Sequence, residues 1–307
     1  MVGAAGRLSI DDFESSFAAL RRRRRTETLL GAAIFVLLLL CAVADTEFYP
    51  SRVLAGLPKI GEYFDKLFSV SPGRGQDRVA VLAWGHLTGG TREPQSAAFW
   101  FYRAGTYIAL LWTTIQMAIL STAMGASVGL LLSFPAARNL GAHAPVRIAI
   151  RRVLELARSV PQVVLAFILI WPFGIGPLAG ILAIAVHTAG ALGKLFSEVN
   201  ENADAKPADG IRAVGGSWLS VMRFGIFPQV VPGFLSLALL RFEINVRSST
   251  IIGFVGAGGI GQEFRRVIAF NIYEEISAIA ILIVIIVSAL DLASERIRGH
   301  FLGALAR

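Results

Sequence analysis

One glycine-rich stretch has the spacing of a nucleotide-binding loop. Residues Gly253–Gly261 read GFVGAGGIG, and Gly256, Gly258 and Gly261 match the G-x-G-x-x-G pattern that holds a dinucleotide pyrophosphate. The pattern indicates a nucleotide site only when a strand precedes it, a helix follows it and an acidic residue stands about 20 positions further on. The neighbouring segments therefore decide what these glycines do.

Four ionisable side chains lie in or beside strongly apolar segments, namely Arg158, Arg241, Glu243 and Arg247. A charge inside a bilayer is costly, so such residues indicate a functional site by default, unless they pair with another span. Glu243 is two residues from Arg241, which puts the two on different faces of a straight helix. Arg158 lies near one end of its apolar segment, where snorkelling or helix pairing is an equal alternative.

The sequence has no motif of a catalytic or metal centre. It contains no H-E-x-x-H pair, no nucleophile elbow and no cluster of His, Asp and Glu with ligand spacing, so we expect no catalytic residue and no metal. A single cysteine, Cys41, excludes a disulfide within the chain. The P-loop pattern G-x-x-x-x-G-K-[ST] is also absent: Gly193-Lys194 comes nearest, but Thr188 and Leu195 occupy its other positions. Any ATP must be bound by another chain.

The composition is that of a membrane protein. Of 307 residues, 55% are hydrophobic and 16% charged, with a mean hydropathy of +0.64, whereas soluble domains carry about 25% charged residues. The net charge of +8 and pI of about 10.2 do not indicate nucleic-acid binding, because the basic residues cluster beside apolar segments. Orientation in a bilayer explains them better.

Hydropathy predicts an all-α polytopic fold with about six transmembrane helices. The expected spans are Leu29–Ala44, Ala104–Phe134, Val153–Trp171, Ile175–Phe196, Gln229–Val246 and Ile276–Leu292. Gly105, Gly125 and Gly129 in the second span are expected to be notches for close helix packing. The connector between the third and fourth spans is so short that these two must be antiparallel neighbours.

Two segments flank the first span. Residues Leu8–Leu20 predict an amphipathic helix on the membrane surface. Ala42–Ala44 also matches a signal-peptide cleavage site, so cleavage after Ala44 stays an alternative. After the span, 45–103 is expected to be a loop outside the membrane, with one helix at Pro58–Phe68.

The distribution of basic residues predicts the orientation. One set of alternate loops carries most of them: Arg21–Arg25, Arg138, Arg147, Arg151, Arg152, Lys194, Lys206, Arg212, Arg223, Arg296, Arg298 and Arg307. The positive-inside rule places this side, and both termini, in the cytoplasm. The expected parts are a cytoplasmic segment (1–28), a first transmembrane helix (29–44), an extracytoplasmic loop (45–103), a permease core (104–292) with a cytoplasmic loop (197–227), and a cytoplasmic tail (293–307).

The glycine stretch lies between the fifth and sixth spans, which excludes a dinucleotide site. No β-α-β unit surrounds it, and no cytosolic nucleotide reaches that side. Together with Ser248, Ser249 and Thr250, its glycines suit irregular backbone that lines a cavity, because bare non-helical backbone is not tolerated against lipid. We expect Gly256, Gly258, Gly259 and Gly261 to form a gate or such irregular backbone; a tight surface turn is the alternative.

A short cytoplasmic helix is expected between the fourth and fifth spans. Pro207 suits the first turn of a helix, Asp209 suits its positive end and Gly215 its stop. Ser217 then caps a second helix, expected to end near Pro228. A self-contained helix of about two turns has no role in a simple pore but can insert into a cleft of a partner.

This segment resembles the E-A-A-x3-G-x9-I-x-L-P loop of ABC importer permeases. Gly215 and Pro228 match its anchors, whereas five positions depart from it: Asp209, Gly210, Ile211, Gly225 and Phe227. Arg158-Ser-Val-Pro161 and the run Arg241–Gly261 are similar to the phosphonate-type permease subunit. The resemblance covers roughly Thr106–Leu292, and Arg241–Gly261 is its most specific part.

The resemblance implies a type I ABC importer permease-like core in a bacterial plasma (inner) membrane. The implied partners are a second copy of the chain, two cytosolic P-loop ATPase subunits that bind ATP and Mg, an extracytoplasmic substrate-binding protein and the lipid bilayer, with no nucleic acid. No cofactor is expected in this chain. The residues expected to couple to the ATPase are Pro207, Asp209, Gly210, Ala213, Gly215 and Pro228.

A phosphonate or phosphate dianion would be helped through such a permease by unpaired guanidinium groups, which match phosphoryl oxygens. The expected substrate pathway residues are Arg247, Ser248, Ser249, Thr250, Arg241, Glu243 and Arg158. Three other polar residues in spans, His187, Gln116 and Asn245, are expected to form interhelical hydrogen bonds instead.

Two rival interpretations stay open. A stand-alone secondary transporter of an anion would show internal repeats and broken helices in both halves, and the sequence has no convincing repeat. A membrane-embedded enzyme acting on lipid phosphate would need paired acidic or His residues near the interface, which are missing. Selectivity among phosphonate, phosphate and phosphite would lie mainly in the binding protein.

Overall fold

The computed structural model describes residues 10–45, 50–70, 79–80, 101–140 and 143–303, which form two compact units, 1–65 and 66–307. In the first unit, residues Ile10–Asp45 form one continuous helix, α1. Its segment Leu20–Asp45 is apolar enough to cross a membrane and has no buried residue in its apolar window, as expected of a helix whose side chains face lipid. Helix α2 (Pro50–Phe68) follows. It begins eight residues before the start of the helix predicted at Pro58–Phe68.

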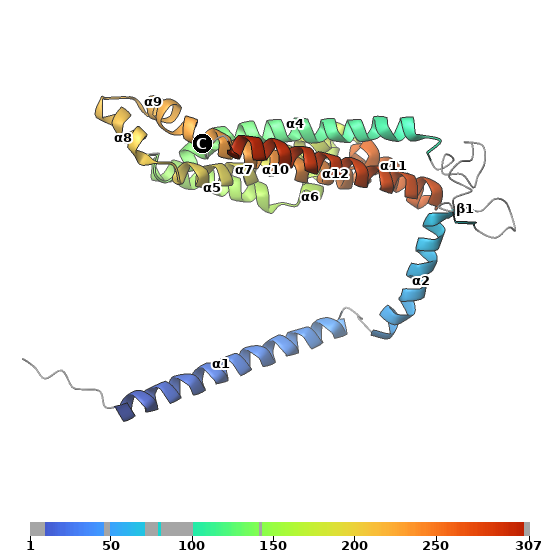
Figure 1. Cartoon of the computed structure of the whole chain (residues 1–307), viewed down its shortest axis with the longest axis horizontal. Helices are drawn as coiled ribbons and strands as arrows, with labels where there is room; N and C mark the ends of the chain where they lie inside the picture. The colour runs from blue at the N-terminus through green and yellow to red at the C-terminus, as the bar shows by residue number, and fades with distance from the viewer. Residues whose placement is uncertain (1–9, 46–49, 71–78, 81–100, 141–142, 304–307) are drawn as a thin grey trace, which may run out of the picture. The chain divides into compact units, whose positions relative to one another are not determined.

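The second unit is a bundle of long helices. Its principal helices are α4 (Ala104–Ala136), α5 (Ala144–Ser159), α6 (Gln162–Phe173), α7 (Pro177–Glu201), α10 (Phe227–Ile252) and α12 (Tyr273–Gly303). The short helices α8 (Ala205–Ala213) and α9 (Trp218–Ser220) lie at one end of the bundle, and α11 (Gly259–Ala269) lies towards the other end (Figure 1). Two antiparallel strands of two residues each, β1 (Ser69–Val70) and β2 (Val79–Ala80), pair with each other.

Five helices of the described residues are long and apolar enough to cross a membrane, or six if the bent pair α5–α6 is one span. The core of the bundle is the contact of α4 with α7, which α10 covers. A Cβ atom at Gly125 would lie 2.6 Å from Thr188 Cβ, and one at Gly129 would lie 2.9 Å from the Gly193 nitrogen. The predicted notches at Gly125 and Gly129 are thus confirmed, whereas Gly105 has no neighbour within 4 Å and is not a notch.

The third predicted span is wrong as a single helix. The chain bends by 92° between α5 and α6, at Val160 and Pro161. Proline has no N–H to donate and drives the preceding residue out of the helical region, and Val160 is extended with φ −79° and ψ 125°. His187 of α7 lies 3.2 Å from the carbonyl oxygen of Val160 and provides it with a partner. Apolar composition alone had concealed this break.

The fifth span is longer than predicted and is joined to irregular turns at both ends. A π-helical segment, Val221–Ile226, continues directly into α10. The helix that was predicted to end near Pro228 therefore does not end there. Pro228 is the second residue of α10 and has no N–H to donate to the preceding π-helical turn. At the other end α10 extends to Ile252, so Arg247 to Thr250 are helical rather than irregular.

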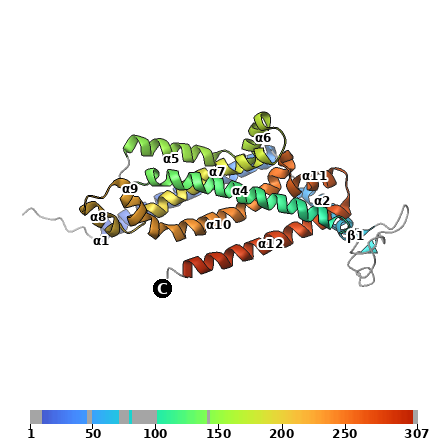
Figure 2. The same ribbon diagram turned by 90° about the horizontal axis from the view of Figure 1, so that it is seen from above.

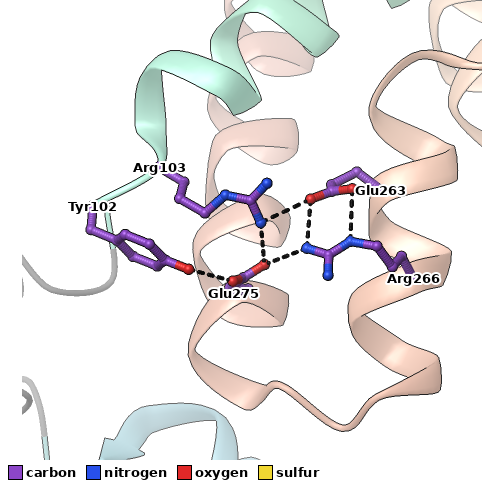
Figure 3. Close-up of polar contacts among 5 residues, drawn as sticks. All are labelled: Tyr102, Arg103, Glu263, Arg266 and Glu275. Atoms are coloured by element: carbon purple, nitrogen blue, oxygen red, sulfur yellow. Dashed lines mark hydrogen bonds and ion pairs between the residues drawn. The ribbon is translucent and has the colours of Figure 1, made fainter.

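An ion-pair cluster joins the start of α4, α11 and α12 (Figure 3). Arg103, before α4, lies 3.1 Å from both Glu263 of α11 and Glu275 of α12. Arg266 contacts the same two carboxylates at 2.7 and 3.0 Å, and the Tyr102 hydroxyl donates to Glu275 at 2.7 Å. Hydrogen bonding from Arg266 holds the pKa of Glu263 below its ordinary value, so this carboxylate stays charged beside the two arginines. It fixes α11 to the start of α4 and α12.

Candidate functional site

The short helix α8 is delimited by specific caps at both ends. The Asp204 side chain accepts a hydrogen bond from the Lys206 N–H at 3.1 Å, which makes Asp204 the N-cap. At the other end, Gly216 N–H donates to Ile211 at 2.9 Å and Gly215 N–H donates to Arg212 at 3.0 Å. Gly215 has φ +81°, a conformation that favours glycine. The predicted helix Pro207–Val214 is therefore Ala205–Ala213, stopped by Gly215 as expected.

One correction concerns Asp209. The first turn of α8 contains no acidic residue, so Asp209 does not act at the positive end of the helix. It pairs instead with Arg212 at 2.8 Å on the exposed side of α8. The N-cap of α8 is Asp204, which was not among the predicted residues.

Two contacts hold α8 to the start of α10. Ala208 is buried against Gly225 of the π-helical segment that leads into α10. A Cβ atom added at Gly225 would lie only 3.1 Å from the Ala208 Cα. The Gln229 side chain binds both backbone groups of Asp204: its oxygen accepts from the Asp204 N–H at 3.1 Å, and its amide donates to the Asp204 carbonyl at 3.2 Å. These contacts connect α8 to the start of α10. Gln229 was not among the predicted residues; its only signal is a polar side chain next to Pro228.

The turn after α8 presents apolar side chains outward. Val214 is 86% exposed, Leu219 67% and Phe224 65%. The indole of Trp218 donates to the Leu140 carbonyl at 2.7 Å, which anchors this turn to the residues that follow α4. Val214 lies directly after α8, whereas Leu219 and Phe224 belong to the helical stretch that leads into α10.

Arg241 carries a positive charge into the middle of the bundle. Its Nε lies 3.4 Å from the Thr188 hydroxyl of α7, and one terminal nitrogen is buried without a hydrogen-bond partner among the described residues. No carboxylate of those residues pairs with it, in contrast to Arg103, Arg151 and Arg247. An uncompensated cation in this position can be neutralised by an anion that enters the bundle.

Asn245 organises the surroundings of Arg241. It lies one turn further along α10 and is fully buried. Its amide donates to Thr122 of α4 at 2.8 Å and to Thr188 of α7 at 3.0 Å. The interhelical role predicted for Asn245 and His187 is confirmed, whereas Gln116 is exposed.

The Asn245 network supports a stability prediction. Asn245→Leu removes two interhelical hydrogen bonds and leaves the Thr188 hydroxyl without its amide partner. Such bonds contribute about 0.6 to 2 kcal/mol each in membranes, so the variant is expected to unfold several degrees earlier in detergent. Gln116→Leu, on an exposed site of α4, is the control. Equal unfolding temperatures for both variants would contradict the network.

Arg247 is not the unpaired guanidinium that the pathway hypothesis requires. It contacts Glu243 one turn back on α10 at 3.0 Å and also pairs with Asp291 of α12. Asp291 was not predicted, because no spacing rule connects two residues on separate spans. The ion pair between Arg247 and Asp291 joins α10 to α12. Arg247 and Thr250 also line a groove between these two helices.

The other predicted pathway residues are separated. Ser249 is buried, and its hydroxyl has no hydrogen-bond partner among the described residues. Thr250 donates back to the Val246 carbonyl at 3.3 Å, and Ser248 is half-buried. Arg158 lies beside Gly190, near the middle of α7, and not at the end of a span. The structure therefore brings Arg241 close to α7 but does not gather all seven residues into one site.

The glycine stretch is irregular and largely buried. Gly256, Gly258 and Gly259 have φ of +101°, +85° and +67°, and a Cβ at Gly261 would lie 2.0 Å from the Thr250 carbonyl oxygen. A π-helical turn, Gly253–Ala257, carries the chain from α10 to α11. The first N–H groups of α11 need partners, and the Thr114 hydroxyl of α4 accepts from Ile260 N–H at 3.0 Å. The alternative of an exposed surface turn is wrong.

Comparisons with known proteins agree with this architecture. The chain is 37% identical over 196 residues to the phosphite transport system permease protein PtxC of Stutzerimonas stutzeri, covering 64% of this chain and 71% of the relative. It is 36% identical over 185 residues to the phosphate-import permease protein PhnE of Mycolicibacterium smegmatis, covering 60% of this chain and 35% of the relative. It is 45% identical over 121 residues to the putative cryptic phosphonate transport system permease protein PhnE2 of Escherichia coli, covering 39% of this chain and 99% of the relative.

A solved structure and a family model cover the core. An inward-facing structure of the MetNI methionine ABC transporter matches with a TM-score of 0.58 at 21% identity, over 65% of this chain and 98% of that one. The likeness confirms the fold, an all-α polytopic core like that of type I ABC importer permeases. The model of binding-protein-dependent transport system inner membrane components matches residues 129–305. The chain therefore belongs to the family of binding-protein-dependent transport system inner membrane components and is a multi-pass inner-membrane protein.

Proposed function

We propose that this chain is the permease subunit of an ATP-driven importer for phosphorus oxyanions, that is phosphonate, phosphite or phosphate. It forms the translocation pathway, and ATP with Mg is bound and hydrolysed by a separate ATPase. The names of PtxC, PhnE and PhnE2 support the substrate class. The observation that carries the proposal is that α10 contacts α8 near one end and, twelve residues further along, carries a guanidinium with no carboxylate partner among the described residues.

The coupling route begins at α8. Two cytosolic P-loop ATPase subunits dock on α8 and on the apolar turn around Val214, so this end of the bundle lies in the cytoplasm. The distribution of basic residues assigns both termini to the same side. ATP-driven closure of the ATPase moves α8, and the Gln229 contact with Asp204 transmits the movement to α10. A helix is a rigid lever, and Arg241 lies twelve residues further along it, about 18 Å away.

Transport then requires that Arg241 is exposed first to one side of the membrane and then to the other. A second copy of the chain completes the pathway, and a substrate-binding protein delivers the oxyanion from the opposite side. Guanidinium groups bind phosphoryl oxygens through paired N–H donors. The oxyanion compensates the charge of Arg241, which lowers the barrier for crossing the bundle. Gly256, Gly258 and Gly259 provide the backbone irregularity about which α10 and α11 rearrange.

The substrate class is tested by uptake into cells that express the chain with its ATPase and binding protein. Labelled phosphonate, phosphite and phosphate are compared with labelled methionine, the cargo named for the MetNI structure. We expect ATP-dependent accumulation of at least one phosphorus oxyanion and no methionine uptake. Uptake of methionine alone would overturn the proposed substrate class while leaving the permease role intact.

A further inference from the structure

A basic hollow lies where α4 ends and α5 begins. The helix α5 lies along the outer edge of the bundle, beside α7 (Figure 2). The hollow has a volume of about 500 Å³ and is lined by Arg138, Arg147, Ile148, Arg151, Arg152 and Glu155. Four of its six lining side chains are arginines, and one is a glutamate.

Two of the four arginines have no carboxylate partner. Arg151 pairs with Glu201 of α7, and Arg152 pairs with Glu155 at 2.6 Å. The side chains of Arg138 and Arg147 form no ion pair with the described residues, although the backbone N–H of Arg138 donates to Glu201 at 2.8 Å. The hollow therefore keeps two guanidinium groups available for an anion.

The hollow has a fixed depth relative to the membrane. Arg138 comes two residues after the end of α4, a span of 33 residues, and Glu201 is the last residue of the spanning helix α7. The ends of spanning helices lie at the level of the lipid headgroups. We therefore infer that the arginines of the hollow lie at the level of the headgroup phosphates.

An apolar stripe runs along α5 next to the hollow. Val146, Val153 and Leu156 are 48%, 59% and 69% exposed, and Ala149 completes their helical spacing. These residues lie on one side of the helix, with Arg152 at its margin. No other described element covers them. Phosphate-binding arginines and a hydrocarbon-binding stripe on one helix match the two parts of a phospholipid.

We propose that this hollow is a binding site for an anionic phospholipid, whose phosphate is held by Arg138 and Arg147 and whose acyl chains lie along the apolar stripe of α5. A free oxyanion would use the arginines but leave the stripe uncovered. A second copy that docked symmetrically on this face would bring its own four arginines against these four, which is unfavourable. The site is distinct from Arg241 and does not depend on which cargo is carried.

The test uses the full chain purified in mild detergent and measures binding of fluorescent dioleoylphosphatidylglycerol. Dioleoylphosphatidylcholine, which has no net charge, is compared as a probe, and inorganic phosphate is added as a competitor. Arg138→Gln/Arg147→Gln removes the free guanidinium groups. Arg265→Gln/Arg296→Gln removes two exposed arginines elsewhere and is the matched control. Val153→Ser/Leu156→Ser tests the apolar stripe.

The wild type is expected to bind phosphatidylglycerol at least tenfold more tightly than phosphatidylcholine, and Arg138→Gln/Arg147→Gln to lose most of this preference. The control pair should keep it, and the serine pair should weaken both lipids. Equal binding of the two lipids by the wild type would overturn the proposal, even if a variant fails to fold. So would full displacement by millimolar inorganic phosphate, which would identify a site for the free oxyanion instead.

Discussion

Arg241→Gln is expected to reduce ATP-dependent oxyanion uptake about ten- to a hundredfold while the complex with the ATPase still assembles. Hydrogen bonds to a charged group contribute about 1.5 to 3 kcal/mol, and each 1.4 kcal/mol corresponds to a factor of ten. Glutamine keeps a donor near Thr188 but removes the charge that compensates a dianion. The measurement is initial uptake rate in proteoliposomes that contain the variant, the ATPase and the binding protein.

The same variant separates a functional cation from a structural one. A buried charge without a partner destabilises the fold, so Arg241→Gln is expected to unfold at a higher temperature than the wild type. Arg241→Lys keeps the charge without the planar pair of donors and should give intermediate uptake. Arg296→Gln, at an exposed site of α12, is the control. Unchanged uptake with Arg241→Gln, or a lower unfolding temperature, would show that Arg241 serves the fold instead.

Gly215→Arg is expected to abolish capture of the ATPase by the purified chain. The positive φ of Gly215 costs any other residue about 1 to 2 kcal/mol, so the C-terminal cap of α8 is lost or strained. The introduced side chain also stands beside Val214, within the proposed docking surface. Co-purification with the ATPase and stimulation of ATP hydrolysis are the two measurements.

The control for this prediction is Gly105→Arg. It introduces the same side chain at a helical glycine with no neighbour within 4 Å of the added Cβ, at the start of α4 and at the other end of the bundle from α8 (Figure 1). It should capture the ATPase as the wild type does. If Gly215→Arg also captures the ATPase and stimulates hydrolysis normally, the docking helix has been assigned to the wrong segment.

Composition and local spacing were sufficient for the membrane class and for α8. The apolar runs are long enough to span a lipid bilayer and too apolar for water. The signals for α8 are local: Pro207 in its first half and Gly215 at its end. The start of α8 was predicted two residues too late, with Asp209 at its positive end, because Asp204 and Asp209 are equally acidic in sequence. Only the hydrogen bond to the Lys206 N–H distinguishes them.

The broken span could have been predicted and was not. Pro161 is visible in the sequence, and a proline in an apolar run disfavours helix at the preceding residue. Hydropathy averaged over 19 residues cannot register a change of direction. The result is a bend of 92° where a straight span was expected.

The pathway residues required the tertiary structure. Arg241 and Arg247 both stand in the run that most resembles the phosphonate-type permease, and nothing local ranks one above the other. Arg247 is paired because Asp291, 44 residues away in sequence, lies beside it. Arg241 is not paired because the neighbouring face of α7 offers Thr188 instead of a carboxylate. Ion pairing across spans depends on packing, which no spacing within one helix contains.

The most direct test of the whole account is ATP-dependent uptake of a labelled phosphorus oxyanion into proteoliposomes that contain this chain, its ATPase and its binding protein. The account predicts accumulation that requires ATP, Mg and all three components, and that does not respond to a proton or sodium gradient. Accumulation by this chain alone, driven by an ion gradient without ATP, would contradict the account and establish a secondary transporter.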